Sequence, residues 1–280
     1  MSSAINNIQY QKAEIFKALH ERDGLFIIPN PWDAGSAKIL TGLGFEAFTT
    51  TSAGLAYVLG RPDGHAMISR EETLDNALAI INATHLPVAA DLENGFGDTP
   101  QACAETILAA AGVGLVGGSI EDATGNDKDP IYDFDLSVAR VKAAVEAARS
   151  LPFHFTLTAR AENMIHGKID LQDTVKRLVA YADAGADVLF APGLKTREQI
   201  SEVVKAVAPK PVNIVLGAAG FDISFNELED LGVKRVSLGS ALARAALGAF
   251  QRAAIELSKG SYNFVNDAVP YLELNKIFGK

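Results

Sequence analysis

The sequence has very little cysteine and no long apolar run. Its single cysteine, Cys103, excludes an internal disulfide. A lone cysteine is typical of proteins in a reducing compartment, so we expect a cytoplasmic location. No apolar run approaches the roughly 18 residues that a membrane-spanning helix needs, and the first residues lack the pattern of a secretory signal. We therefore expect a soluble intracellular protein with no membrane partner.

Basic residues are also few. The chain has 25 Lys and Arg against 34 Asp and Glu, a formal net charge of −9. No Lys/Arg cluster is dense enough for a nucleic-acid surface, so nucleic acid is not an expected partner. The apolar share of 48% is ordinary for a globular protein. A small molecule is the partner class that remains.

About eight short apolar segments alternate with about eight helical patterns along the chain. Predicted strands span 25–29, 45–51, 87–92, 115–121, 153–160, 188–192, 211–215 and 235–239. Predicted helices span 7–22, 33–40, 69–84, 99–111, 135–149, 171–184, 196–207, 225–231, 240–258 and 262–277. This alternation predicts an α/β fold, a (β/α)₈ TIM barrel with additional N- and C-terminal helices.

An open doubly wound sheet is the alternative architecture. The first predicted strand is not followed by the Gly-x-Gly-x-x-Gly turn that a dinucleotide-binding sheet requires, which disfavours this alternative. No linker or low-complexity segment interrupts the repeat. We predict a single domain over residues 1–280, with the helices of 240–280 involved in oligomer packing.

Two acids end the predicted strand at 87–92. Residues two apart in a strand face the same way, so Asp91 and Glu93 are expected to project together. Adjacent carboxylates repel each other unless a cation lies between them or one is protonated. Oxygen-only ligands of this kind suit Mg²⁺ or Mn²⁺. A solvated strand end with scattered acids is the simpler reading of this stretch alone.

Other polar residues follow the ends of four further predicted strands. They are Thr50 to Ser52, Glu121 with Asp122, Arg160 with Glu162, and Asn213. Because the carboxyl ends of barrel strands carry the chemistry of such folds, this convergence predicts an active-site rim. Arg160 could also serve to neutralise Glu121 or Glu162. Cys103 lies inside a predicted helix and is expected to be a small core residue.

Four short motifs occur in order between about residues 25 and 240. They are Leu-Gly-Arg-Pro-Asp at 59–63, Asp-Leu-Glu-Asn-Gly-Phe-Gly at 91–97, Ile-Glu-Asp at 120–122 and Thr-Ala-Arg at 158–160. Together they resemble the isocitrate lyase and phosphoenolpyruvate mutase superfamily. The resemblance implies a Mg²⁺-dependent (or Mn²⁺-dependent) enzyme that acts on a small carboxylic acid through an enolate.

The resemblance also implies roles for individual residues. The metal set would be Asp91, Glu93, Asp63 and Glu121, with Asp91 nearest the ion and the others acting largely through water. The substrate set would be Thr51, Ser52, Ala53, Gly95, Arg160 and Asn213, with backbone amides at 51–53 holding a carboxylate and Asn213 on the far wall. The catalytic set would be Arg160, Asp63 and Glu121, with Arg160 stabilising developing negative charge.

The loop at 122–133 departs from the superfamily pattern. Lyases of the superfamily have a cysteine about eight residues past the glutamate corresponding to Glu121, and this chain has Asp129 there. The mutase branch has Lys-x-Asn, whereas here Asn126 precedes Lys128. Isocitrate or methylisocitrate cleavage is therefore disfavoured. Oxaloacetate decarboxylation or a related 2-oxo or 2-hydroxy acid cleavage is favoured, because it requires least from this loop.

Two alternative functions remain open. One is P–C bond chemistry, by a mutase or hydrolase, on phosphonopyruvate or phosphoenolpyruvate. The other is a non-catalytic barrel that binds a carboxylate. In either case, the resemblance implies a homodimer or homotetramer that exchanges its eighth helix, and the alanine-rich segment 241–250 would suit close helix packing.

Overall fold

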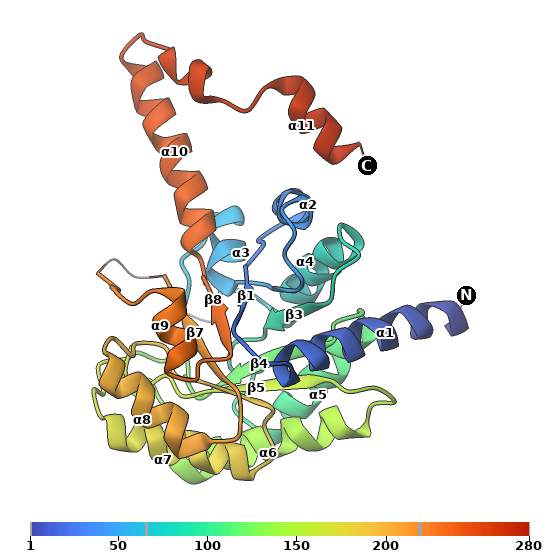
Figure 1. Ribbon diagram of the computed structural model, residues 1–280, viewed down its shortest axis with the longest axis vertical. Coiled ribbons are helices and arrows are strands. Elements are labelled where there is room, and N and C mark those ends of the chain that lie inside the picture. Colours follow the sequence, from blue (N-terminus) through green and yellow to red (C-terminus); the bar gives the residue numbers. More distant parts are fainter. Residues whose placement is uncertain (1, 65–66, 218–219, 280) are drawn as a thin grey trace.

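Eight parallel strands form a nearly closed barrel (Figure 1). The computed structural model describes residues 2–64, 67–217 and 220–279. The strands are β1 (Phe26–Ile28), β2 (Phe48–Thr49), β3 (Val88–Asp91), β4 (Gly117–Glu121), β5 (Thr156–Arg160), β6 (Val188–Phe190), β7 (Val212–Val215) and β8 (Arg235–Ser237). They pair in the order β1-β8-β7-β6-β5-β4-β3-β2. At the seam between β1 and β2, the Thr49 amide donates to the Pro29 carbonyl at 3.2 Å. The predicted (β/α)₈ fold is confirmed, and the doubly wound alternative is wrong.

Helices follow the strands around the barrel. They are α1 (Ser2–Glu21), α2 (Ala34–Gly42), α3 (Ser52–Val58), α4 (Arg70–Asn82), α5 (Pro100–Gly112), α6 (Phe134–Ser150), α7 (Leu171–Asp183), α8 (Arg197–Val207), α9 (Phe225–Asp230), α10 (Ala241–Ser258) and α11 (Tyr271–Phe278), with a 3₁₀ turn, η1 (Asn263–Asp267). Capping side chains explain where several of these helices begin. Ser69 and Glu72 form a reciprocal capping box at the start of α4, as their spacing indicates.

Two expected elements were wrong. The segment predicted as one helix at 262–277 is divided into η1 and α11, because Pro270 lacks an amide hydrogen and restricts the residue before it. The segment predicted as a strand up to residue 51 ends at Thr49, and Thr51 instead caps the unpredicted helix α3 by accepting from the Gly54 amide at 3.2 Å.

The amino-terminal end of the barrel is closed by α1. Phe16 and Leu19 of this helix pack with Phe26 and Ile28 of β1 in one buried apolar cluster. Gly117, at the start of β4, makes room for α1, since a Cβ there would lie 2.9 Å from a ring carbon of Phe16. Apolar packing of α1 therefore covers the barrel at this end.

The C-terminal segment extends from the barrel as an arm. Figure 1 shows α10 leading away from the strands, with η1 and α11 turning back towards α2. The Lys38 ammonium of α2 donates to the Phe278 carbonyl of α11 at 2.8 Å. Within the described ranges, no helix has the length and apolar character to cross a bilayer.

Candidate active site

Arg160, the last residue of β5, is the centre of the charged rim. Its guanidinium contacts three carboxylates, those of Asp91 at 2.7 Å, Glu121 at 2.9 Å and Glu162 at 2.8 Å. The contact with Glu121 follows from strand pairing, because Glu121 of β4 and Arg160 of β5 are direct partners in the sheet. The expectation that Arg160 pairs with Glu121 or Glu162 is confirmed, and it pairs with both.

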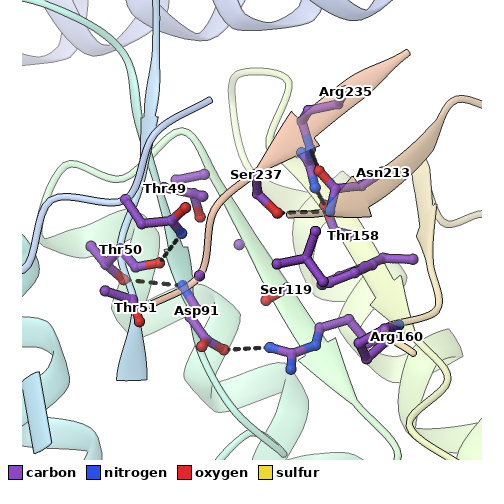
Figure 2. Close-up of a pocket in the computed structure, with 17 residues that line it drawn as sticks. Thr49, Thr50, Thr51, Asp91, Ser119, Thr158, Arg160, Asn213, Arg235 and Ser237 are labelled. Carbon is purple, nitrogen blue, oxygen red and sulfur yellow. Dashed lines mark hydrogen bonds and ion pairs between the residues drawn. The ribbon is translucent and has the colours of Figure 1, made fainter. Parts of the chain in front are cut away.

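Asp91 ends β3 opposite Arg160 (Figure 2). Its Oδ1 accepts from Arg160, and its Oδ2 accepts from the Ser52 amide at 3.2 Å. The Asp91 amide in turn donates to the Thr50 hydroxyl at 3.1 Å. Contacts from α3 and β5 therefore orient this carboxylate, and Thr50, just after β2, holds its backbone.

Asp63 and Glu93 add negative charge beside Asp91. Burial, followed by the charges of Asp91 and Asp63, raises the pKa of Glu93 to about 7. Burial and the charge of Asp91 also raise the pKa of Asp63, although Ser52 and Arg160 oppose this shift. These carboxyl groups are close enough to disfavour each other's ionised form.

Glu121 and Glu162 complete the acidic group on the other side of Arg160. Burial raises the pKa of both, and the charge of Arg160 opposes the shift in each. Three carboxyl groups therefore contact one guanidinium at this end of the barrel, and two more, those of Asp63 and Glu93, lie within range of its charge. This excess of negative charge is the dominant electrostatic feature of the rim.

The loop after β3 is held in a strained form. Glu93 and Phe96 both have left-handed backbone angles, with φ of 46° and 58°. Arg140 restrains the loop by donating to the carbonyls of Asn94 and Gly97. Strain of this kind persists only when the surroundings impose it, and it is often found at functional sites.

Two adjoining cavities open beside Asp91 and Arg160. The outer one, of about 480 Å³, lies at the rim and is lined by Thr51, Ser52, Ala53 and Asp63, among others. The inner one, of about 150 Å³, extends into the barrel and is lined mainly by small and polar side chains. Figure 2 shows Asp91 with Arg160 at one side of the inner cavity, and Asn213, Ser237 and Arg235 at the other.

The predicted site residues are distributed over the rim and the cavities. Asp63, Asp91, Glu93, Glu121 and Arg160 gather at the rim, and Thr51, Ser52 and Ala53 lie on the wall of the outer cavity. Asn213 lies in the inner cavity, where its side chain binds Ser237 and Arg235. Gly95 lines neither cavity and packs on Cys103, whose Sγ lies 3.0 Å from the position of an added Cβ.

Apart from Asn213, sequence reasoning missed the polar residues of the barrel interior. Ser119, Thr158, Arg235 and Ser237 all line the inner cavity. Their signal in the sequence was period-2 placement of polar residues within buried strands, but the individual residues are ordinary strand or surface types. Cys103 is fully buried, which confirms its expected place in the core.

The loop at 122–133 directs its acids away from the cavities. Asp129 is exposed and lines neither cavity. Asp122 is 2% exposed and accepts hydrogen bonds from Arg177 at 3.0 Å and from the Tyr181 hydroxyl at 2.7 Å. Asp122 thus anchors the loop to α7, accepts from the Glu162 amide at 2.8 Å behind the rim, and lines neither cavity.

The geometry defines a (β/α)₈ protein with an acidic rim around one arginine and a polar interior. The phosphoenolpyruvate phosphomutase family model matches residues 16–258. An uncharacterized protein of Mycobacterium tuberculosis is 33% identical over 261 residues, 92% of this chain and 94% of that protein. An oxaloacetate decarboxylase of Rhodopseudomonas palustris is 30% identical over 223 residues, 77% of this chain and 74% of that enzyme.

Solved structures of related proteins have the same fold. A Burkholderia cenocepacia J2315 protein, described only as a candidate lyase or mutase, is 57% identical, with a TM-score of 0.95 over 98% of both chains. Oxaloacetate acetylhydrolase, solved with its product oxalate, is 27% identical, with a TM-score of 0.87 over 96% of this chain and 94% of that one. The chain therefore belongs to the phosphoenolpyruvate phosphomutase family, within the isocitrate lyase and phosphoenolpyruvate mutase superfamily.

Proposed function

We propose that this protein is a divalent-metal-dependent lyase that cleaves a C–C bond of a small 2-oxo or 2-hydroxy carboxylic acid through an enolate. Decarboxylation of oxaloacetate is the favoured reaction. One observation carries the proposal: five carboxyl groups gather at the mouth of a polar cavity, three in contact with one arginine and two within range of its charge. Relatives that are named for reactions of oxaloacetate support it. We propose the cytoplasm as its location.

The acidic rim fits a hard divalent cation. Burial and mutual repulsion raise the pKa values of Asp63 and Glu93, and a cation beside them would remove that repulsion. Among the described residues, no three acidic, His or Cys side chains lie close enough together to coordinate an ion directly. Asp91 would therefore hold Mg²⁺ or Mn²⁺, with Asp63, Glu93 and Glu121 acting largely through water. Mg²⁺ in proteins usually retains several water ligands. When bound, the ion would supply Lewis-acid stabilisation of enolate charge.

The residues of the chain would position and stabilise the substrate. Arg160 is held by three carboxylates, so its guanidinium is already oriented when a substrate arrives. It would face the charged end of the acid and oppose charge that develops as the C–C bond breaks. The segment 51–53 on the cavity wall would hold a carboxylate. In oxaloacetate decarboxylation, the bonding electrons remain on pyruvate enolate as carbon dioxide leaves, and water supplies the proton.

A second candidate function is P–C bond chemistry on phosphonopyruvate. The observation that favours it is the family model, which is named for phosphoenolpyruvate phosphomutase. Phosphorus NMR of phosphonopyruvate with the enzyme distinguishes the two, because only this candidate changes the phosphorus signal. A non-catalytic barrel would bind carboxylates and form no product with any acid.

A metal-dependence assay tests the proposed function. We expect turnover of at least one acid in a panel of 2-oxo and 2-hydroxy mono- and dicarboxylates, with oxaloacetate among the best. Chelation should lower kcat/KM at least about 100-fold, since that factor corresponds to about 2.7 kcal/mol of lost charge stabilisation. Mg²⁺ should restore the rate. Turnover that is unchanged after chelation and dialysis would refute the role of the metal.

We also propose that the C-terminal arm mediates oligomer formation. Large apolar side chains on it are exposed, among them Phe250 at 71% and Leu272 at 79%. Apolar side chains that are exposed together on one segment often mark a surface that a partner covers. We expect light scattering to give the mass of a dimer or a tetramer, and Phe250→Asp to shift it towards the monomer. Ile169→Asp, on an exposed loop outside the arm, is the control and should leave the mass unchanged. A monomeric wild type would contradict the proposal.

A further inference from the structure

A second arginine, Arg235, lies inside the barrel. It is the first residue of β8 and is only 5% exposed. Its Nε donates to the Asn213 amide oxygen at 2.8 Å, and one terminal nitrogen donates to the Thr158 hydroxyl at 3.0 Å. The other terminal nitrogen lies 3.2 Å from Nε2 of His20, a residue of α1. Each of these three partners is uncharged or can be uncharged.

The charge of Arg235 has no counter-ion in the described part of the chain. No carboxylate there lies within ion-pair distance of it, whereas Arg160 and Arg177 each contact at least two. Burial alone lowers the pKa of Arg235 to about 9, with no acid opposing the shift. Because that value still lies above neutral pH, the side chain is a buried cation under ordinary conditions.

His20 cannot balance this charge. Burial, and then the charge of Arg235, lowers the pKa of His20 to about 3, so the ring is neutral. Nδ1 of His20 lies 2.8 Å from the Phe16 carbonyl, which can only accept. Nδ1 therefore carries the ring proton, and Nε2 is free to accept from Arg235. The imidazole completes a hydrogen bond and supplies no negative charge.

Arg235 lines the inner cavity and not a packed core. Barrel interiors are usually filled by bulky branched side chains. Here the lining includes Ala89, Gly118, Ser119, Thr158 and Ser237, and about 150 Å³ remains open. A cavity needs only about 10–15 Å³ to hold one water, so this space admits a larger guest. A guanidinium has five N–H groups, of which the three contacts above use three.

We propose that the inner cavity is a binding site for a small anion, held against Arg235 by its guanidinium and by the hydroxyls of Ser237 and Thr158. Both hydroxyls already accept hydrogen bonds, so each can donate its own proton to a guest. A buried cation is costly unless it is paired, and an anion at this position supplies the pair.

The acid group could come from either of two sources. One is a free ion from solution. The other is the far carboxylate of a dicarboxylic substrate, because the inner cavity adjoins the outer one and shares Thr51, Asp91 and Arg160 with its lining. This second source rests on the proposed function, whereas the first does not. On the second source, the enzyme selects dicarboxylates over monocarboxylates of equal length.

The first arm of the test uses bromide and no divalent metal. Thermal unfolding is followed in sodium bromide and in sodium gluconate of equal ionic strength, gluconate being too large for the cavity. We expect the Tm of wild type to rise by about 2 °C in bromide at ten times the Kd of bromide. Crystals soaked in bromide should show anomalous scattering beside Arg235. Arg235→Met should lose the gain. Lys234→Met removes the neighbouring, outward-facing charge and should keep it.

The second arm compares succinate with butyrate by calorimetry in the presence of Mg²⁺. These acids have the same chain length and differ by one carboxylate. We expect wild type to bind succinate at least about tenfold more tightly than butyrate, because a hydrogen bond to a charged group contributes about that much affinity. Arg235→Met should lose most of this difference. If Arg235→Met does not fold, Ser237→Val replaces it in the test. This variant fills space beside Arg235 and keeps the charge of the arginine, so it should weaken the binding of both bromide and succinate.

The outcomes separate this inference from the proposed function. A bromide effect without a succinate preference assigns the site to a free ion, and a succinate preference without a bromide effect assigns it to the substrate. Both results support an anion at Arg235, whether or not the protein turns over oxaloacetate. If wild type and Arg235→Met respond alike to bromide and to succinate, there is no anion site.

Discussion

Replacing Asp91 with asparagine should lower kcat/KM for the substrate at least about 1,000-fold while the protein remains folded. The expected loss corresponds to about 4 kcal/mol, the scale of losing a metal ligand that stabilises transition-state charge. The variant keeps the shape of the side chain and one acceptor oxygen, and its amide nitrogen gives up one of the two hydrogen bonds that Asp91 accepts from the Ser52 amide and Arg160. It also removes one carboxylate from a crowded group of five carboxyl groups, which limits the cost to folding.

Asp187→Asn is the matched control for this experiment. Asp187 also accepts from an arginine at short distance, Arg149 at 2.6 Å, and also accepts from a backbone amide, that of Leu157. Its side chain is 18% exposed, against 16% for Asp91. Asp187 lies before β6, away from the rim, so this variant should keep kcat/KM within about threefold of wild type. A rate for Asp91→Asn similar to that of the control, at saturating Mg²⁺, would exclude Asp91 as the metal-holding residue.

The rim could be predicted because its information is local. Asp91, Glu121 and Arg160 each end a short apolar segment, and parallel strands bring such ends to one side of a barrel. Once the strand order is β3-β4-β5, the contact between Glu121 and Arg160 follows from register. The structure confirms the fold and this contact, and the chemical roles of the rim residues stay predictions.

The barrel interior could not be predicted in the same way. The dipeptide Lys234-Arg235 has the composition of an exposed basic turn, and only closure of β8 between β1 and β7 directs Arg235 inward. Its partner His20 is 215 residues away in the chain. Depth inside a closed barrel depends on pairing of strands that are distant in sequence, which local periodicity does not encode.

Gly95 is a motif residue whose expected contact with a substrate stays a prediction. Gly95 lies in a superfamily motif, and the resemblance placed it with the substrate. The structure gives it a φ of +80° and seats it against Cys103 of α5, so packing and backbone conformation account for glycine there. Glycine at position 95 therefore shapes the loop after β3, which also carries Glu93.

Replacing Arg160 with methionine should lower the free energy of unfolding by at least about 3 kcal/mol and abolish turnover. The variant would leave Asp91, Glu121 and the 1%-exposed Glu162 together without their cation, and breaking a buried ion pair from one side typically costs about 3–5 kcal/mol. Arg149→Met is the control, because it breaks a more exposed pair with Asp187 and should cost less than about 1 kcal/mol.

The destabilisation should also depend on pH. Burial already raises the pKa of Glu121 and Glu162 in the folded protein, and the charge of Arg160 limits the rise. Without Arg160 their folded pKa values rise further above the unfolded values, so the folded state binds more protons than the unfolded state and loses stability as pH increases. Urea denaturation should therefore show a larger deficit for Arg160→Met at pH 8 than at pH 5, and no such difference for Arg149→Met. An equal deficit at both pH values would mean that Arg160 contributes packing to the rim and not charge balance.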